Sequence, residues 1–150
     1  MANPDLVKPC ERALTAAEAA LVAGALARSN APQEFHSQLS LLQVVAESTS
    51  NWPILEFSVA GRRGMAKAGM RNVADFQFRT PKGLLGFSIY ECEGLLAGME
   101  CWAIDGRADP DVWPTVEALI PLESEMHRTA INTDVPIEAR PSTWSSDNMK

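Results

Sequence analysis

The spacing of hydrophobic positions changes near residue 42. Before that point, apolar side chains recur every three or four residues, first over 14–27 and again over 35–42. Beyond it, short runs in which apolar and polar residues alternate follow one another as far as residue 104. The first spacing is typical of amphipathic helices and the second of strands with one buried face. The pattern therefore predicts N-terminal helices followed by a sheet.

Two helices are predicted in the first part. The first begins after Thr15, because Thr15 and Glu18 have the spacing of a capping box, in which the hydroxyl and the carboxylate each satisfy a free backbone N–H. Ser29 and Asn30 end this helix, and Pro32 stands where proline is favoured in the first turn of the next. We expect a short antiparallel pair. The apolar stripes are Leu14, Leu21, Val22 and Ala25 in the first helix, and Phe35, Leu39 and Leu42 in the second.

The strands are predicted over 44–47, 54–59 and 73–79, followed by a hairpin over 83–106. In the second strand Leu55, Phe57 and Val59 alternate with polar residues, which indicates a half-buried strand. We expect an α+β fold in which the two N-terminal helices pack on an antiparallel sheet of about four to five strands. Residues 1–128 would form this single domain. Prolines, serines and scattered charges over 129–150 predict a peripheral or flexible C-terminal tail.

The turn of the hairpin decides which residues of its strands share a face. A two-residue turn at Glu93-Gly94 would place Phe87 on the same face as Trp102. A three-residue turn, Cys92-Glu93-Gly94 with Gly94 left-handed, instead groups Phe87 with Met99. We prefer the three-residue turn because it gathers a wholly apolar face for the core. The opposite face then carries Ser88, Tyr90, Leu96, Gly98, Glu100, Trp102 and Ile104.

Composition places the chain among ordinary globular proteins. Its 150 residues are 46% hydrophobic, enough for a core without disulfides, and the three cysteines form no CxxC pair. The apolar run over 14–27 is shorter than the ~20 residues needed to cross a bilayer, and residues 1–10 do not resemble a secretory signal. A net charge of −6 argues against binding to nucleic acid or anionic membranes. A cytoplasmic protein is expected.

No motif predicts catalysis, a metal or a cofactor. The segment Gly86-Phe87-Ser88-Ile89-Tyr90 lacks the second glycine of a serine-hydrolase elbow. His36 and His127 have no neighbours at ligand spacing. Cys92 lies between Glu91 and Glu93, whose charges disfavour the thiolate that a nucleophile requires. We therefore expect a non-enzymatic protein.

The outer hairpin face has the features of a protein interface. Tyr and Trp are enriched at interface hot spots, and here Tyr90 and Trp102 stand among acids. The alternative is that residues 109–122 cover this face. Over 81–125 there are nine acidic against two basic residues, whereas 61–80 has a net charge of +4. This uneven distribution of charge, with its acidic part over 81–125, favours a basic protein partner. The predicted contact residues are Ser88, Tyr90, Glu93, Glu100, Trp102 and Asp105.

Three segments carry a resemblance to a known group of proteins. They are Leu14-Thr15-Ala16-Ala17-Glu18, Leu55-Glu56-Phe57, and the run from Gly94 to Trp102 with Asp105-Gly106 after it. Their order over roughly 14–122 resembles small bacterial proteins found beside polymorphic or contact-dependent toxins, many of which are immunity proteins. The resemblance implies a cytoplasmic protein that neutralises a cognate toxin, often a basic nuclease, by covering its active site or exit surface. Because immunity proteins vary most where they bind, it assigns no binding residue.

Two other functions remain open at this stage. One is a small ligand-binding domain or enzyme with a pocket between the sheet and residues 109–122, which would hold convergent polar groups near Glu100 or His36. The other is an accessory subunit of a larger bacterial complex, which would use the same kind of surface.

Overall fold

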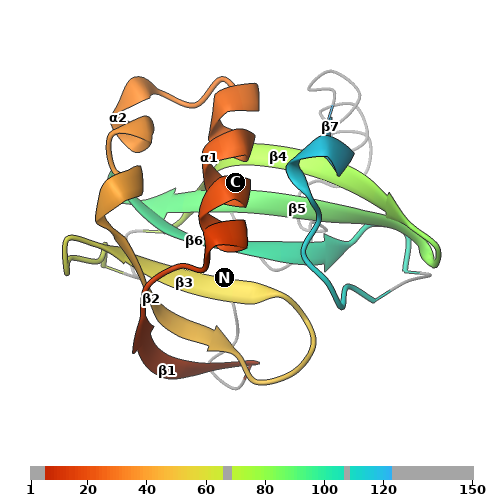
Figure 1. The fold of residues 1–150 in the computed structure, drawn as a ribbon, viewed down its shortest axis with the longest axis horizontal. Coiled ribbons are helices and arrows are strands. Elements are labelled where there is room, and N and C mark those ends of the chain that lie inside the picture. Colours follow the sequence, from red (N-terminus) through yellow and green to blue (C-terminus); the bar gives the residue numbers. More distant parts are fainter. Residues whose placement is uncertain (1–5, 66–68, 107–108, 123–150) are drawn as a thin grey trace.

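The protein consists of a seven-stranded antiparallel sheet with its helices on one face (Figure 1). The computed structural model describes residues 6–65, 69–106 and 109–122. We call the sheet face under α1 the inner face and the opposite one the outer face. The strands lie in the order β1-β2-β3-β6-β5-β4-β7. Along the chain the elements are β1 (Val7–Arg12), α1 (Ala16–Arg28), α2 (Gln33–His36), η2 (Leu39–Leu41), β2 (Leu42–Ser48), β3 (Ile54–Val59), β4 (Arg71–Thr80), β5 (Gly83–Cys92), β6 (Leu95–Ala103), η4 (Val116–Ala118) and β7 (Ile120–Pro121).

The α+β class is confirmed, but the sheet has seven strands and not four to five. The two strands missing from the prediction are β1 and β7, which form its two edges. β1 contains Pro9 and three charged residues, Lys8, Glu11 and Arg12, and has no clear alternation, which is typical of edge strands. β7 has only two residues, opposite Phe76 and Gln77 of β4. Among the described residues, no helix is long and apolar enough to cross a membrane. The predicted tail, 129–150, and His127 lie outside the described residues.

The first helix is as predicted and the second is shorter. The Thr15 hydroxyl accepts from the Glu18 N–H at 3.1 Å, and the Glu18 carboxylate accepts from the Thr15 N–H at 2.9 Å, which completes the capping box. The second helix is the single turn α2, with η2 after it. It ends at His36, and Leu42, expected on its apolar stripe, is the first residue of β2.

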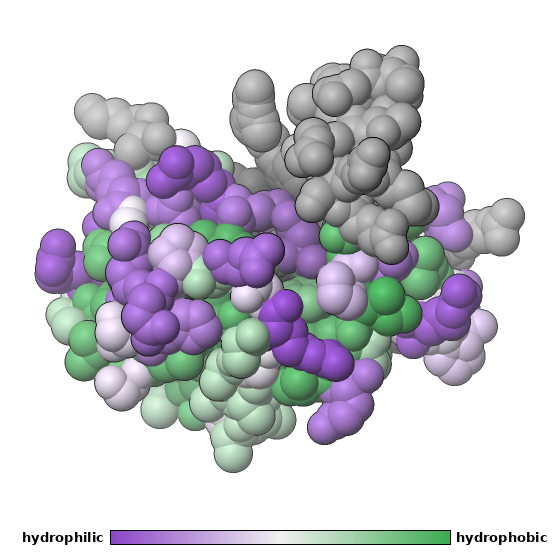
Figure 2. All heavy atoms as spheres, turned by 90° about the horizontal axis from the view of Figure 1, so that it is seen from above, coloured by the Kyte–Doolittle hydropathy of each residue, from purple (hydrophilic) through white to green (hydrophobic). Residues whose placement is uncertain are grey.

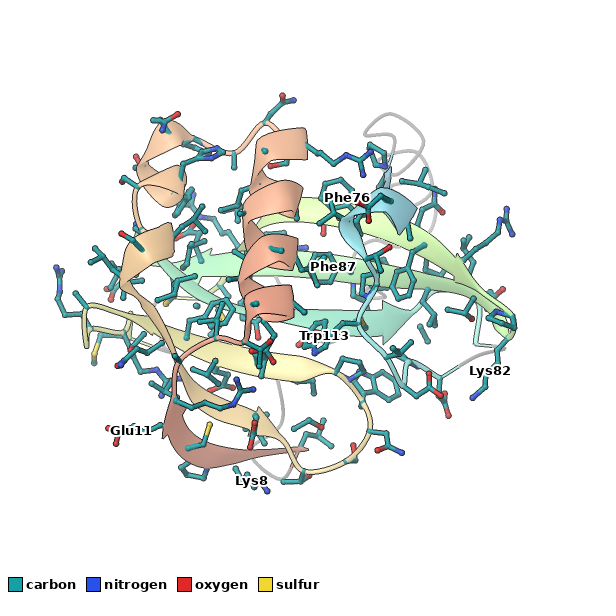
Figure 3. The ribbon with its side chains drawn as sticks, viewed as in Figure 1. Lys8, Glu11, Phe76, Lys82, Phe87 and Trp113 are labelled. Carbon is teal, nitrogen blue, oxygen red and sulfur yellow. The ribbon has the colours of Figure 1, made fainter. Side chains whose placement is uncertain are left out.

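The core lies between α1 and the inner face. Figure 3 shows Phe76, Phe87 and Trp113 gathered on this side of the sheet, and the rings of Phe87 and Trp113 meet edge to face at a centroid distance of 6.0 Å. Trp113 belongs to the segment 109–122. The same segment places Leu119 in the core, with 3% exposure, and Val116 against α1 at Gly24. Residues 109–122 therefore cover the inner face and do not cover the outer one.

The hairpin turn differs from the prediction, yet most residues lie on the predicted faces. Cys92 pairs with Leu95, so Glu93 and Gly94 form a two-residue turn, with φ of 55° and 81°. Such a turn alone would place Phe87 opposite Glu100, on the same face as Trp102. A β-bulge at Ala97 shifts the register by one residue, and Phe87 pairs with Cys101. Between the turn and the bulge the prediction is wrong for Leu96, which was expected on the outer face and lies in the core with 1% exposure.

Candidate binding site on the outer face of the sheet

The outer face presents polar and aromatic side chains from the four strands β3, β6, β5 and β4. Two rows of paired residues cross its centre. In the first, Glu56 on β3 lies opposite Gly98 on β6, and Gly98 lies opposite Tyr90 on β5. The second row contains Ile54, Glu100, Ser88 and Asp75, on β3, β6, β5 and β4 in that order. Because the strands are adjacent, residues remote in the sequence become neighbours here.

Each aromatic ring of this face lies over a glycine. A Cβ placed on Gly98 would come within 2.7 Å of the Tyr90 hydroxyl oxygen, and one on Gly86 within 2.3 Å of the Trp102 ring. Both glycines stand directly opposite the aromatic residue across the ladder. The rings therefore lie along the sheet, and the Tyr90 ring extends across Gly98 towards β3. Any larger residue in place of the glycine would lift the ring from this position.

A chain of hydrogen bonds holds Trp102 in place. Its indole Nε1–H donates to Ser88 Oγ at 2.9 Å, and the Ser88 hydroxyl donates to Asp75 Oδ1 at 2.6 Å. The Asn72 amide also donates to Asp75 Oδ1, at 2.9 Å. The chain crosses β6, β5 and β4. Ser88 is thus engaged as a connector between Trp102 and a carboxylate.

Two glutamates lie diagonally across β3 and β6 in the centre of the face. Glu56 is 7% exposed, and its Oε1 accepts from Arg63 Nη2 at 2.8 Å. Glu100 is half-buried and makes no hydrogen bond or ion pair with any residue that the structure describes. Burial raises the pKa of Glu100, and the charge of Glu56 raises it further. The pair therefore concentrates negative charge where hydration is incomplete.

The Tyr90 hydroxyl is a buried polar group without a partner. The side chain is 5% exposed, and its oxygen has no hydrogen-bond partner within the described part of the chain. Burial raises the pKa of Tyr90 well above its usual value, and the charges of Glu100 and Glu56 add to this while Arg63 opposes it. The hydroxyl thus lies in the field of both glutamates. Leaving such a group unsatisfied costs roughly 1–3 kcal/mol.

The structure separates the six predicted contact residues into two sets. Ser88, Tyr90, Glu100 and Trp102 lie together on the outer face, but Ser88 and Tyr90 are buried and only Glu100 and Trp102 are half-buried. Glu93 and Asp105 are exposed and lie beyond opposite ends of β6. Glu93 Oε1 accepts from the Met65 N–H at 2.7 Å, which ties the hairpin turn to the preceding loop. Their contact with a partner stays a prediction.

Glu56 and Arg63 belong to the site although sequence reasoning did not select them. β3 was predicted to be half-buried, but all six of its residues are buried, including Glu56 and Ser58. An acid within a run of buried residues, followed shortly by arginines in a glycine-rich loop, is the signal that would have found the pair. Arg71 of the same basic region binds the buried Glu91 at 2.7 Å. The charges of this region are thus partly neutralised, and the molecule is less polarised than its sequence indicates.

The thiols of the hairpin have raised pKa values. Burial, and after it the charges of Glu93 and Glu91, raises the pKa of Cys92, whose Sγ lies 3.0 Å from the Met65 carbonyl. Burial raises the pKa of Cys101 as well, followed by the charge of Glu100. Neither environment favours a nucleophilic thiolate. Within the described residues, no group of three or more His, Cys, Asp or Glu side chains is arranged to hold a metal ion.

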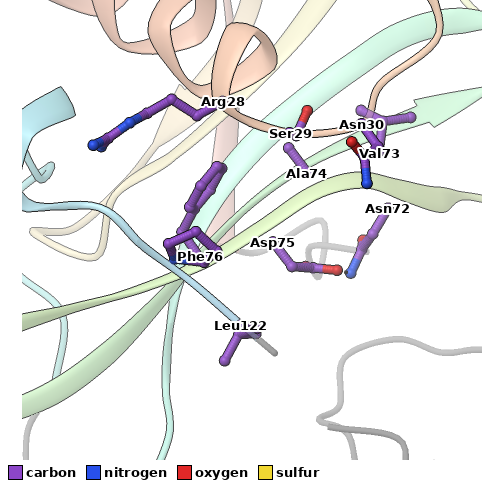
Figure 4. A pocket seen from close by; sticks show the side chains of 10 residues that line it. Arg28, Ser29, Asn30, Asn72, Val73, Ala74, Asp75, Phe76 and Leu122 are labelled. Carbon is purple, nitrogen blue, oxygen red and sulfur yellow. Dashed lines mark hydrogen bonds between the residues drawn. The ribbon is translucent and has the colours of Figure 1, made fainter. Parts of the chain in front are cut away.

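A separate pocket lies where the end of α1 meets the edge of the sheet (Figure 4). Its volume is about 300 Å³, and it is lined by residues 28–30, 72–76 and 121–122. Arg28 is directed away from the hollow, and its Nη1 donates to the Val116 and Leu119 carbonyls at 2.6 and 3.2 Å. Asn72 and Asp75 bind each other. The lining includes neither Glu100 nor His36, and most of its polar groups are already paired within the protein.

The upper surface of the molecule is mixed in character. Seen from above in Figure 2, hydrophilic and hydrophobic side chains are intermixed on the described surface. In comparisons with protein-family models, curated proteins and solved structures, the chain matches none of them.

Proposed function

We propose that this chain is a non-enzymatic, cytoplasmic binding protein that neutralises a basic bacterial toxin domain, and that it binds this domain with the outer face of its sheet. The observation that carries the proposal is the pair of glutamates in the centre of that face. Arg63 is the one described cation in contact with them. A positively charged partner would offset the remaining negative charge.

The neighbouring aromatic residue supports a protein partner. Trp102 is half-buried beside Glu100, and its indole is held by Ser88. A rigid indole next to carboxylates offers both apolar area and charge complementarity, the combination found at interface hot spots. Since 109–122 packs on the inner face, these residues do not cover Trp102 or Glu100. The resemblance to immunity proteins supplies the class of partner.

Co-expression with the product of the adjacent gene tests the proposal. We expect a stable complex and rescue of growth when that product is toxic. Gln77, on the outer face beside Gly86, offers a site for an added charge. Gln77→Lys should weaken the complex about tenfold, which corresponds to ~1.4 kcal/mol, because it places a cation against a basic partner.

Gln33→Lys is the matched control, since Gln33 is exposed on α2, on the inner side of the sheet. It should leave the affinity unchanged. Absence of a complex together with absence of rescue would exclude immunity to that toxin. Equal weakening by both lysines would show that the outer face is not where the partner binds.

A further inference from the structure

We propose that Glu56, Glu100 and the Tyr90 hydroxyl form a subsite for one lysine or arginine side chain of the basic partner. This inference rests on the proposed function and adds to it the group that the partner must supply. The three residues come from β3, β6 and β5, which are consecutive in the sheet. The subsite therefore lies at the centre of the outer face.

The position of Tyr90 depends on Gly98. Gly98 stands between Tyr90 and Glu56 in the same row, and its missing side chain leaves room for the phenol ring. The hydroxyl oxygen consequently lies over β6, on the side of β3. Glu100 is two residues along β6 from Gly98, so its side chain is on the same face and diagonal to Glu56. Three oxygen-bearing groups thus converge from separate strands.

The chemistry of these groups selects a cationic donor. An ionised carboxylate only accepts hydrogen bonds. A phenol oxygen can accept one hydrogen bond while its own O–H donates to a carboxylate. An ammonium has three donors and a guanidinium five, with no acceptor. Such a cation would use the Tyr90 oxygen, which is otherwise unsatisfied, and would compensate the charge of Glu100. The described residues include no third acid, histidine or cysteine here for a metal ion.

The ion pair between Arg63 and Glu56 shows how a cation reaches the subsite. Its side chain is 49% exposed, while the Glu56 side chain that it binds is 9% exposed. The guanidinium therefore approaches the buried carboxylate from the solvent side. A partner's cation arriving beside Arg63 would occupy the half of the site formed by Glu100 and Tyr90. Two cations would then face two carboxylates, so the desolvated charges balance.

The Tyr90→Phe variant gives effects of opposite sign on stability and binding. Removing an unsatisfied buried hydroxyl while keeping the ring should raise the urea midpoint of the free protein. The same change should weaken the toxin complex severalfold, because the partner's cation loses an acceptor. A purely structural role of Tyr90 would not produce a more stable protein that binds less well. A lower midpoint, or unchanged affinity, would overturn the assignment of Tyr90.

Side-chain analogues test the subsite without a toxin. We would titrate protein carrying ¹³C-labelled glutamate carboxyls with n-butylammonium and n-propylguanidinium, which represent lysine and arginine side chains, and follow the Glu56 and Glu100 signals by NMR. We expect saturable shifts in the millimolar range, with 1-butanol producing none. Glu100→Gln should weaken the binding severalfold, and Glu117→Gln, an exposed acid in η4, should not.

The analogue titration separates this inference from the proposed function. Saturable binding would support the subsite even if the adjacent gene product proved not to be the partner. Absence of saturable shifts, or equal shifts in the Glu100→Gln variant, would overturn it. Tighter binding of Mg²⁺ than of either organic cation would also overturn it, because the site would then be a metal site.

Discussion

Two glycines on the outer face owe their place to the aromatic residues opposite them. Gly86 and Gly98 leave space for Trp102 and Tyr90, and in this way the rings cover the backbone of the neighbouring strand. A glycine inside a strand normally weakens it. Here its absence of a side chain is what allows Tyr90 to reach the glutamates and Trp102 to reach Ser88.

Gly98→Ala should destabilise the protein by about 1–3 kcal/mol, as overpacking does. The added Cβ would lie 2.5 Å from the Leu55 carbonyl oxygen, a backbone atom that cannot move independently of β3. Urea unfolding measures the effect. The adjacent Ala97→Ser is the control and should change stability by less than about 0.5 kcal/mol. A Gly98→Ala variant as stable as this control would show that the close approach is relieved at little cost.

Residue-level prediction from the sequence succeeded where the residue type and its strand position agreed. Ser88, Tyr90, Glu100 and Trp102 were expected together, and the sheet brings them together. Their burial was not predictable, because it depends on which strands lie on either side. Glu56 was missed for the same reason. The position of Glu56 opposite Gly98 can be recognised only when β3 is known to pair with β6.

At the level of elements, the N-terminus of α1 is fixed by charge as well as by its cap. The Glu18 carboxylate completes the capping box and also binds Arg12 of β1 at 2.8 and 3.1 Å, and Arg12 in turn binds Glu47 of β2 at 3.2 Å. Despite the opposing effect of burial, the hydrogen bonds from Arg12 and Thr15 leave the pKa of Glu18 below its usual value. These contacts join the helix to the edge of the sheet.

Glu18→Gln should lower the free energy of unfolding at pH 7 by roughly 0.5–2 kcal/mol, the range for loss of a helix cap. Because the pKa of Glu18 is lowered by folding, its ionised form stabilises the folded state above the pKa of the unfolded chain, about 4.3. This contribution is lost as the pH falls through the folded-state pKa. The difference between variant and wild type should therefore shrink in acid. Denaturation series at several pH values measure it.

The control for this prediction is Glu34→Gln, which changes an exposed acid in the first turn of α2. Glu34→Gln should lower the free energy of unfolding at pH 7 by much less than Glu18→Gln does. A deficit of the Glu18→Gln variant that stays constant from neutral pH into acid would contradict the role of the carboxylate charge.

The elements also show where sequence patterns are sufficient. The long strands and the capped helix were predictable because each has a regular apolar spacing of its own. The edge strands were not, since β1 has few apolar residues to alternate and β7 is too short. The hairpin faces were predicted correctly for most residues but from the wrong turn, because the bulge at Ala97 has no clear sequence signal. The two-residue turn and the bulge together keep most apolar residues of the hairpin on one face.

At the scale of the whole molecule, the basic region over 61–80 and the acidic strands are partly joined. The ion pairs Arg63–Glu56 and Arg71–Glu91 bring arginines onto buried acids, and Lys82 binds Asp111 at 3.0 Å. The net charge of −6 nevertheless remains. It acts over distances comparable to the screening length, about 8 Å at physiological ionic strength.

Association with the basic partner should consequently slow as salt is added. Between 50 and 500 mM NaCl we expect the association rate constant to fall by about tenfold or more, with a smaller change in the dissociation rate constant. Stopped-flow or surface-based kinetics measure both. The Gln77→Lys variant should show a shallower dependence, because its local charge is less negative. A rate that does not depend on salt would argue against electrostatic attraction between the two proteins.

The strand order has a consequence for how the protein folds. β4, β5 and β6 follow one another in the chain and in the sheet, so they can form through local turns, whereas β3 and β6 meet only after a long intervening segment has closed. Closure of that segment brings Glu56 and Glu100 together, two like charges with incomplete hydration. This long-range closure would thus also be the step that electrostatic repulsion opposes. A cation bound between these strands would favour the closed sheet.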